Sequence, residues 1–235
     1  AASRGKNKVA TKERREEAAK GIGADAATKK LGDFSASCVD EAAIQRAGTT
    51  ALKPLLATVT GVKDAKSWSS ALITLHKLGI WAVWNVSVQA DLKASTVNIT
   101  YLDPAGLGLP DRDYYVKPEL KDKLDAYKLH VSRMLALGGK QGPAADAGAA
   151  DVLAIETEIA KLTKTAVEQR DIQAAYNPTD AAGLARQVKA IDWRGYWKGV
   201  GAEPSRKLVL GTPKFFAAFD KLRAQFTFPQ WASYF

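Results

Sequence analysis

The sequence has few residues of the types that bind metals or crosslink chains: one cysteine, Cys38, and two histidines, His76 and His130. A single cysteine can form neither an internal disulfide nor a Cys-x-x-Cys zinc site. The histidines stand 54 residues apart, whereas a zinc hydrolase places two of them one helical turn apart. We therefore predict no metal site in this chain, and we expect each histidine to be a helix residue satisfied by a neighbouring polar group.

Catalytic motifs are missing as well. The sequence contains no nucleophile elbow, no phosphate-binding loop and no Gly-x-Gly-x-x-Gly. Glu156 and Glu158 are two residues apart, so on a helix they do not share a face and make a poor acid and base pair. Asp111 and Asp113 flank Arg112, a pattern that favours an ion-pair clamp within a loop over catalysis. The residues taken alone thus predict no catalytic residue.

Long apolar runs are also absent. No stretch of 18 apolar residues occurs, and Ala1 to Lys20 is basic and polar where a signal peptide carries an apolar segment. We expect neither a membrane span nor an export signal within this chain. The remaining composition, 46% hydrophobic and 25% charged over 235 residues, is typical of a globular domain and not of a disordered chain.

Positive charge gathers at one end of the sequence. The net charge is +9, and residues 1–30 contribute nine basic and four acidic groups, a net of +5. A basic arm of this kind can follow a phosphate backbone. Acidic residues interrupt it, however, and no aromatic ladder accompanies it, so solvated surface charge is favoured over nucleic-acid binding. We predict a basic, poorly packed leader over residues 1–30.

Apolar residues recur at three- and four-residue spacing through most of the chain, as in helices that bury one face. Asp25 fits the N-cap of a helix that Gly48 ends. We expect this helix to turn four side chains toward a core, Cys38 as a buried small residue: Leu31, Phe34, Cys38 and Ile44. Other helices are expected as follows: a polar one from Thr11 to Gly21, then from about Thr50, from Ser67, from Pro118 to Gly138, through Val152 to Leu162, and after Thr179, Asp192 and Thr212.

The period of the pattern changes in two places. Residues 83–89 and 97–101 alternate apolar with polar, which predicts two strands of an antiparallel hairpin joined by a loop at 90–96. Asp103 to Asp113 contains two prolines and two glycines and is predicted to be a structured loop. The predicted fold class is mainly α, a multi-helix lobe with one small antiparallel β-hairpin at about residues 80–102.

Three segments carry a recognisable pattern. Residues 31–41 read Leu-Gly-Asp-Phe-Ser-Ala-Ser-Cys-Val-Asp-Glu, and residues 106–115 read Gly-Leu-Gly-Leu-Pro-Asp-Arg-Asp-Tyr-Tyr. The third segment joins Glu-Thr-Glu-Ile-Ala at 156–160 to Arg-Asp at 170–171 and Tyr-Asn-Pro at 176–178. In this order they resemble the neprilysin family of zinc endopeptidases, which includes endothelin-converting enzymes and bacterial relatives. The second segment is the most similar to the family pattern.

The resemblance implies that residues 31–235 form most of a helical cap lobe of such a peptidase, incomplete at both ends. In the family, the zinc, its His-Glu-x-x-His ligands and the general base belong to a C-terminal catalytic half, and this chain has none of those motifs. The lobe faces that half across an internal cavity that admits oligopeptides and refuses folded proteins. The resemblance also implies a location outside the cytoplasm, periplasmic or secreted.

We therefore expect a fragment of a zinc endopeptidase that is inactive by itself and whose partner is the missing catalytic half. Zinc is expected only in the parent enzyme, with no catalytic or metal-binding residue here. The candidate functional segment, in a structural or cavity-lining role, comprises Arg112, Asp113, Tyr114 and Tyr115. The alternatives are a free-standing helical module that binds anionic polymers, or a scaffold domain that binds a protein partner.

Overall fold

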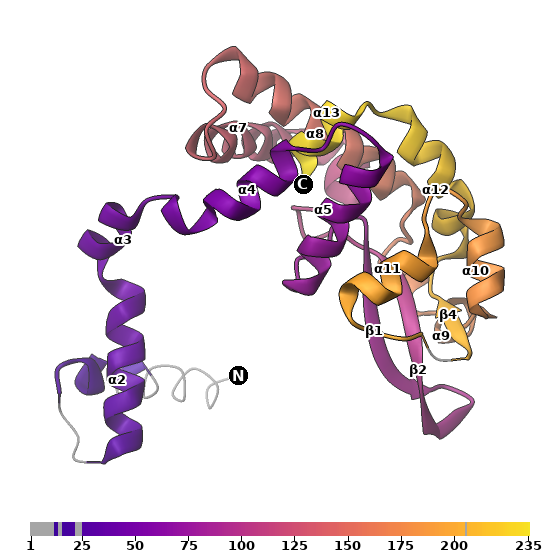
Figure 1. The fold of residues 1–235 in the computed structure, drawn as a ribbon, viewed down its shortest axis with the longest axis horizontal. Helices are drawn as coiled ribbons and strands as arrows, with labels where there is room; N and C mark the ends of the chain where they lie inside the picture. Colours follow the sequence, from indigo (N-terminus) through magenta and orange to yellow (C-terminus); the bar gives the residue numbers. More distant parts are fainter. Residues whose placement is uncertain (1–11, 14–15, 22–24, 205) are drawn as a thin grey trace. The chain divides into compact units, whose positions relative to one another are not determined.

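The computed structural model describes residues 12–13, 16–21, 25–204 and 206–235. The chain divides into two compact units, Ala1–Leu52 and Lys53–Phe235 (Figure 1). Much of the basic leader predicted over residues 1–30, and parts of the polar helix expected from Thr11, lie outside the described residues.

In the first unit, the helix expected to follow Asp25 is divided into two. The elements are α2 (Ala26–Val39), α3 (Glu41–Ala47) and the 3₁₀ helix η1 (Thr50–Leu52). α2 begins where predicted, because the Asp25 carboxylate accepts two backbone N–H groups of the first turn, at 3.0 and 2.9 Å. Asp40 ends α2 and caps α3, accepting a backbone N–H at 2.8 Å. Gly48 ends α3, as predicted.

The prediction that this region faces a core is wrong. The four side chains expected to be buried are all exposed: Leu31, Phe34, Cys38 and Ile44. Among the described residues of this unit only Ala18 and Gly32 are buried. Among the described residues of this unit, no sheet forms a second layer over the apolar faces of α2 and α3.

The second unit is dominated by helices, which confirms the mainly α prediction. The helices expected after Thr179, Asp192 and Thr212 begin at Ala181, Trp193 and Pro213. None of the described helices combines the length and the apolar character needed to cross a bilayer. The helical elements are α4 (Lys53–Thr60), α5 (Ala65–Lys77), α6 (Asp113–Val116), η2 (Pro118–Leu120), α7 (Lys121–Leu137), α8 (Pro143–Leu162), η3 (Glu168–Arg170), α9 (Ile172–Ala175), α10 (Ala181–Gln187), α11 (Trp193–Val200), α12 (Pro213–Gln225) and α13 (Phe228–Tyr234).

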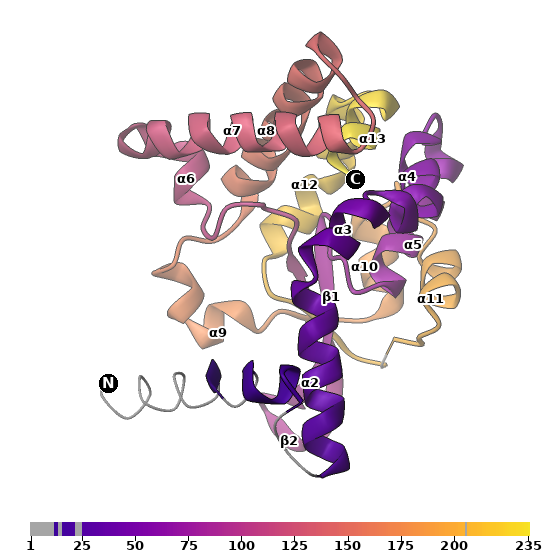
Figure 2. The same cartoon turned by 90° about the vertical axis from the view of Figure 1, so that its left-hand side faces the viewer.

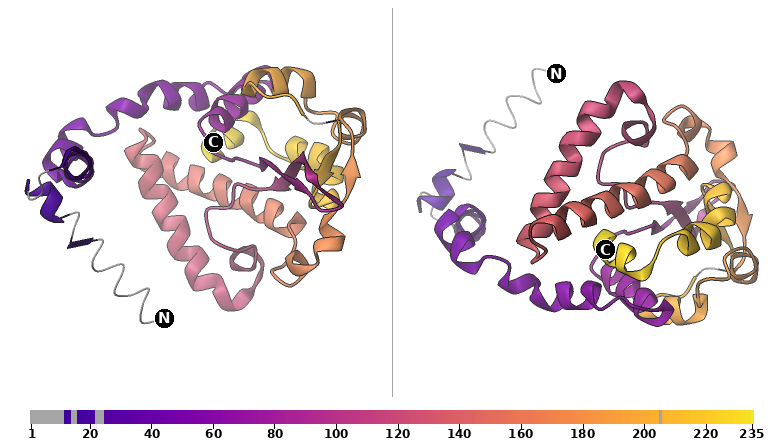
Figure 3. Two further views of the ribbon diagram at one scale, coloured as in Figure 1. Left: turned by 90° about the horizontal axis from the view of Figure 1, so that it is seen from below. Right: turned by 90° about the horizontal axis from the view of Figure 1, so that it is seen from above.

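The helices α7 and α8 are the longest of the described elements, and they converge at the short loop that joins them (Figure 3). Val131 of α7 packs there with Ala149 and Val152 of α8 in a small apolar cluster. The Ser132 hydroxyl donates a hydrogen bond of 2.6 Å to Asp146 across the same contact. Helices joined by a few residues are usually neighbours in space, and α7 and α8 follow this tendency.

A four-stranded sheet lies among these helices, in the order β1-β2-β4-β3. Its strands are β1 (Trp84–Asp91), β2 (Ala94–Pro104), β3 (Pro178–Thr179) and β4 (Leu208–Leu210). β1 and β2 form the predicted antiparallel hairpin, with a turn at residues 92–93 that is shorter than the expected loop. The end of the hairpin extends clear of the helices of its own unit (Figures 1 and 2). The sequence pattern missed β3 and β4, and β4 pairs in parallel with β2.

The core of the second unit is rich in aromatic rings. Trp68, Trp84 and Trp231 are fully buried, and the rings of Trp84 and Phe219 meet edge to face at 5.4 Å. Four apolar residues of α12 are all buried: Phe215, Phe216, Phe219 and Leu222. This core covers one face of the β1–β2 hairpin. The opposite face carries a smaller apolar cluster of Ile99, Tyr101 and Val209.

His76 confirms the expectation of a histidine satisfied by polar neighbours. Its Nδ1 lies 2.7 Å from the Tyr196 hydroxyl and its Nε2 lies 2.9 Å from the backbone carbonyl oxygen of Ala82. Burial lowers the pKa of His76 from 6.5 to about 4, because the charged imidazolium loses hydration. His130, in contrast, is exposed.

We predict that His76 makes stability depend on pH. Between about pH 4 and 6.5 the unfolded chain binds a proton that the folded protein refuses, so the free energy of unfolding falls as the pH falls through this window. The full effect is about 3 kcal/mol. Urea denaturation at several pH values measures the free energy of unfolding of the wild type and of His76→Gln. The difference between the two is expected to shrink toward low pH. His130→Gln is the matched control, and an equal pH dependence of both differences would contradict the prediction.

Candidate functional site

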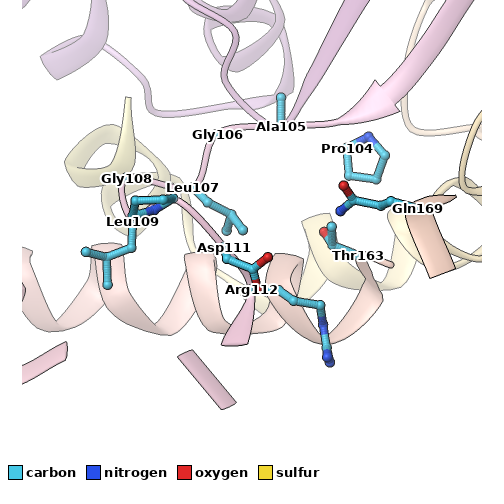
Figure 4. A pocket seen from close by; sticks show the side chains of 11 residues that line it. Pro104, Ala105, Gly106, Leu107, Gly108, Leu109, Asp111, Arg112, Thr163 and Gln169 are labelled. Atoms are coloured by element: carbon cyan, nitrogen blue, oxygen red, sulfur yellow. The ribbon is translucent and has the colours of Figure 1, made fainter. Parts of the chain in front are cut away.

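The segment singled out by the sequence lies between β2 and α6 and runs along α8 (Figure 4). Residues 104–112 form the predicted loop and border a cavity of about 390 Å³, whose opposite wall includes Thr163 and Gln169. Two prolines and two glycines prevent this loop from forming regular structure. Its backbone polar groups must therefore find partners elsewhere.

The partner is a buried carboxylate on α8, that of Glu156, which is 4% exposed. Its Oε1 accepts the backbone N–H of Gly108 at 3.2 Å and the Tyr127 hydroxyl at 3.0 Å. Its Oε2 accepts the Tyr115 hydroxyl at 2.8 Å. That hydroxyl in turn accepts the backbone N–H of Leu109 at 2.9 Å. One carboxylate thus joins the loop, α6 and α7 to α8.

The electrostatics of this cluster follow from its burial. Loss of hydration raises the pKa of Glu156 from 4.5 to about 7, although its three hydrogen-bond donors act in the opposite direction. Burial, together with the neighbouring carboxylate, raises the pKa of both Tyr115 and Tyr127 well above 10. A carboxyl group of this pKa has the proton affinity of a general acid or base. Both of its oxygens accept hydrogen bonds, however, so Glu156 holds neighbouring segments in place and is not free to contact a substrate.

Of the two aspartates expected to pair with Arg112, only Asp113 does so among the described contacts. Its Nη1 lies 3.4 Å from Asp113 Oδ1, and its Nε donates to the backbone carbonyl of Ala160 on α8 at 2.9 Å. Asp111 is held differently, since its Oδ1 accepts the backbone N–H of Asp113 at 2.8 Å. Asp113 pairs in addition with Lys117 at 2.8 Å. Arg112 therefore fastens α8 to the start of α6.

The two adjacent tyrosines of the segment differ in their surroundings. Tyr115 is buried at the centre of the cluster. Tyr114 is half-buried, and its hydroxyl makes no hydrogen bond among the residues that the structure describes. The structure thus brings Arg112 and Tyr115 against α8 and leaves Tyr114 to one side.

A second pair of hydrogen bonds, here called the second fastening, joins the loop to Tyr234 in α13. The Tyr234 hydroxyl donates to the backbone carbonyl of Gly106 at 2.9 Å and accepts the backbone N–H of Val83 at 3.0 Å. Val83 has a φ of 67°, a left-handed conformation that costs a β-branched residue about 1–2 kcal/mol. Its carbonyl also accepts the N–H of Ala105 at 2.9 Å, so contacts on both sides hold this strained residue.

Sequence reasoning found Tyr115 but missed the role of Glu156. It weighs Glu156 as an acid and base partner of Glu158 and as part of the third family segment, yet Glu156 lies within the buried stripe of α8 formed by Val152, Ile155 and Ile159. A glutamate inside an apolar stripe is a signal of a satisfied buried carboxylate. Gly108 is required by close approach, because a Cβ there would lie 1.9 Å from the Tyr127 hydroxyl oxygen.

Glu156 and Tyr127 also border a second cavity, of about 460 Å³, between α4, α7, α8 and α13. The described residues hold no group of three or more His, Cys, Asp or Glu side chains that could bind a metal ion. His76 uses both ring nitrogens in the core, as described above. The donor set of the described residues therefore does not fit a zinc site.

Comparison with known proteins places this arrangement in context. A model of peptidase family M13 matches residues 3–235. The chain is 29% identical over 176 residues to endothelin-converting enzyme 1 of Cavia porcellus, covering 71% of this chain and 23% of that protein. It is 26% identical over 135 residues to the neutral endopeptidase of Lactobacillus helveticus, covering 57% of this chain and 21% of that protein. The chain thus spans less than a quarter of the length of these relatives.

Solved structures give the same result. The zinc metalloprotease Zmp1 of Mycobacterium tuberculosis, in its open state, aligns with 98% of this chain at a TM-score of 0.84 and 30% identity. The alignment covers 37% of that chain. PepO from Lactobacillus rhamnosis aligns with 95% of this chain and 37% of its own at a TM-score of 0.73 and 18% identity, which supports the fold alone.

The buried carboxylate leads to a prediction about pH. Between pH 4.5 and about 7 the folded protein keeps a proton on Glu156 that the unfolded chain has lost, so the free energy of unfolding falls as the pH rises through this window. Glu156→Gln removes the effect, and its stability relative to the wild type is expected to improve by about 3 kcal/mol from pH 4 to pH 8. Urea denaturation at each pH measures the difference. Glu158→Gln, two residues away and paired with Lys161 at the surface, should show no such trend. The same trend in both variants would refute the assignment.

The adjacent tyrosines provide a second test. Tyr115→Phe removes a hydroxyl with two buried partners, Glu156 and the Leu109 N–H, and is expected to lower the free energy of unfolding by about 1–3 kcal/mol. Tyr114→Phe removes a hydroxyl without a hydrogen bond among the described residues and should change it by less than about 0.5 kcal/mol. Equal losses in the two variants, measured by urea denaturation at pH 7, would show that the cluster does not hold the loop.

Proposed function

This chain belongs to peptidase family M13, as its resemblance to the neprilysin family implied, and on that premise we propose that it is part of a zinc endopeptidase that cleaves oligopeptides. The observation that carries the proposal is the family match over residues 3–235, joined to structural similarity over nearly the whole chain. In this proposal the chain supplies the helical N-terminal lobe, and a partner half supplies the chemistry.

The role proposed for the lobe is to wall the substrate cavity and to limit what enters it. The fixed loop at 104–112 supports this role, because a wall that selects by size must keep its shape. Of the four candidate residues, Arg112, Asp113 and Tyr115 act in it by anchoring the loop to α8 and α6 and not by contacting a reacting bond, whereas Tyr114 takes no part in the anchoring. The described carboxylates offer no free acid and base pair, in keeping with a wall.

The zinc of the family fits no set of side chains among the described residues. We therefore assign the zinc ligands and the general base to the catalytic half, and derive no catalytic step from this chain. The partners proposed are that half and oligopeptide substrates. On the family likeness we also propose that the protein works outside the cytoplasm, as a periplasmic or secreted enzyme.

The proposal predicts a division of labour between the two halves. The purified chain is expected to bind no stoichiometric zinc and to leave a fluorogenic oligopeptide uncut. The complete protein is expected to cut that peptide and to lose this activity when a chelator removes its zinc. Metal analysis and fluorescence assays measure these outcomes. Cleavage by the chain alone, with zinc bound in stoichiometric amount, would overturn the assignment.

Selection by size has its own test. The same oligopeptide is offered to the complete protein in two forms, free in solution and embedded in a stable folded domain. The free form is expected to be cleaved and the embedded form to survive, as read by mass spectrometry. Equal cleavage of both forms would contradict the role of a wall.

A further inference from the structure

The face of the sheet that lies opposite the aromatic core ends in a cavity. β2 and β4 run in parallel, with Leu102 opposite Leu210, and both end at the same edge of the sheet. A cavity of about 340 Å³ opens there. It adjoins the cavity of Figure 4, because both are lined by Pro104, Thr163 and Gln169. The carboxyl ends of parallel strands are a frequent place for ligands in open sheets.

Two hydrogen-bond acceptors on this face lack donors. Asn85 and Asp103 are directly opposite each other in the β1–β2 ladder, and both line the cavity. Neighbours of this kind have Cβ atoms about 4.5–5.5 Å apart. The Asn85 Oδ1 is buried and has no hydrogen-bond partner among the described residues. The Asp103 carboxylate likewise has no hydrogen bond or ion pair within the described part of the chain, and burial raises its pKa above the usual value.

The other end of the same sheet face shows how unusual this is. Asp91 is buried, whereas Asp103 is half-buried, and the Asp91 carboxylate accepts the Tyr176 hydroxyl at 2.7 Å and the backbone N–H of Lys93 at 2.9 Å, and pairs with Lys207 at 2.8 Å. These contacts lower the pKa of Asp91 to about 2, the Lys207 hydrogen bond being the largest cause. A buried carboxylate is ordinarily satisfied in this way. Asp103 lies on the same face of the sheet but receives no such hydrogen bond.

None of the side chains that line the cavity makes a hydrogen bond to Asp103 or to the Asn85 Oδ1 among the described residues. The Lys164 ammonium donates to the backbone carbonyl of Ala174 at 3.0 Å, and its charge acts on Asp103 without an ion pair. The Gln169 amide nitrogen donates to the Lys164 carbonyl at 3.0 Å, and the Thr163 hydroxyl donates to the Ile159 carbonyl at 2.9 Å. The side-chain oxygens of Gln169 and Thr163 are further acceptors, so the cavity suits a ligand rich in donors.

We propose that this cavity binds a guanidinium group, the head of an arginine side chain, with Asp103 as its charge partner and Asn85 as a second acceptor. A guanidinium carries five N–H donors in a planar fork, which suits a carboxylate and a neighbouring amide oxygen. A divalent cation such as calcium takes about 6–8 oxygen ligands, usually with several carboxylates, and Asp103 is the one carboxylate among the described residues that line this cavity. Gly211 leaves room for the carboxylate, because a Cβ there would lie 1.7 Å from Asp103 Oδ1.

The test uses N-acetyl-arginine amide as the probe and N-acetyl-citrulline amide as its neutral counterpart of the same shape. Isothermal titration of the 235-residue chain is expected to show saturable binding of the arginine compound and at least about tenfold weaker binding of the citrulline compound, because a hydrogen bond between charged groups is lost. Asp103→Asn keeps the size of the side chain and removes the charge, and it should abolish the preference for arginine. Asp125→Asn removes one charge from the exposed face of α7 and should keep the preference.

Asn85→Ala provides an independent variant, expected to weaken binding of the arginine compound while leaving the Asp103 side chain in place. Thermal unfolding of each variant without probe verifies that it is folded. Equal binding of the two compounds by the wild type, or full binding by folded Asp103→Asn, would overturn the proposal. The source of the guanidinium is decided with the complete protein. If the complete protein also binds the arginine compound, the site is open to an arginine of a peptide ligand. If only the 235-residue chain binds it, an arginine from the rest of the protein fills the site in the complete protein.

Discussion

The Glu156 carboxylate accepts hydrogen bonds from the loop at 104–112, from α6 and from α7. Removing its charge from water is unfavourable, and three donors offset that cost. The loop cannot form a helix or a central strand, so the Gly108 N–H depends on this acceptor directly and the Leu109 N–H depends on it through the Tyr115 hydroxyl. The course of the segment most similar to the family therefore depends on one side chain of α8.

The second fastening completes the loop's attachment. Tyr234, near the end of the chain, holds Gly106 and the strained Val83 through one hydroxyl. A left-handed valine persists only where its neighbours determine its conformation. Together the two fastenings define a fixed wall built from residues that lie far apart in the sequence, as the proposed role of a size-selective lobe requires.

The small sheet separates two kinds of environment. One face carries the aromatic core, where Trp84 meets Phe219 and the helices around it. The other face is polar at both ends, with Asp91 fully satisfied at one end and Asp103 without a donor at the other. A cluster of Ile99, Tyr101 and Val209 separates these ends. The same alternation of side chains that builds the core thus brings the acceptors of the cavity together.

Apolar patterning alone did not identify which surfaces are covered. Period and caps placed the start of α2 and the end of α3, because both depend on neighbours within a few residues, but missed the break between them at Asp40. The same pattern in α12 led correctly to a buried face, whereas in α2 it led to side chains such as Phe34 that are exposed. An amphipathic face indicates a need for a partner, and the partner itself is a tertiary property.

The amino-acid sequence by itself determined the helices, the hairpin, the structured loop and the family, since these rest on local period, caps, glycines, prolines and short motifs. The tertiary structure decided the rest. β3 and β4 are two and three residues long and carry too little pattern to detect. The meeting of Glu156 with Tyr115, and of Asp103 with Asn85, joins residues well separated along the chain, and only the packing of α8 and the register of the sheet bring their side chains together.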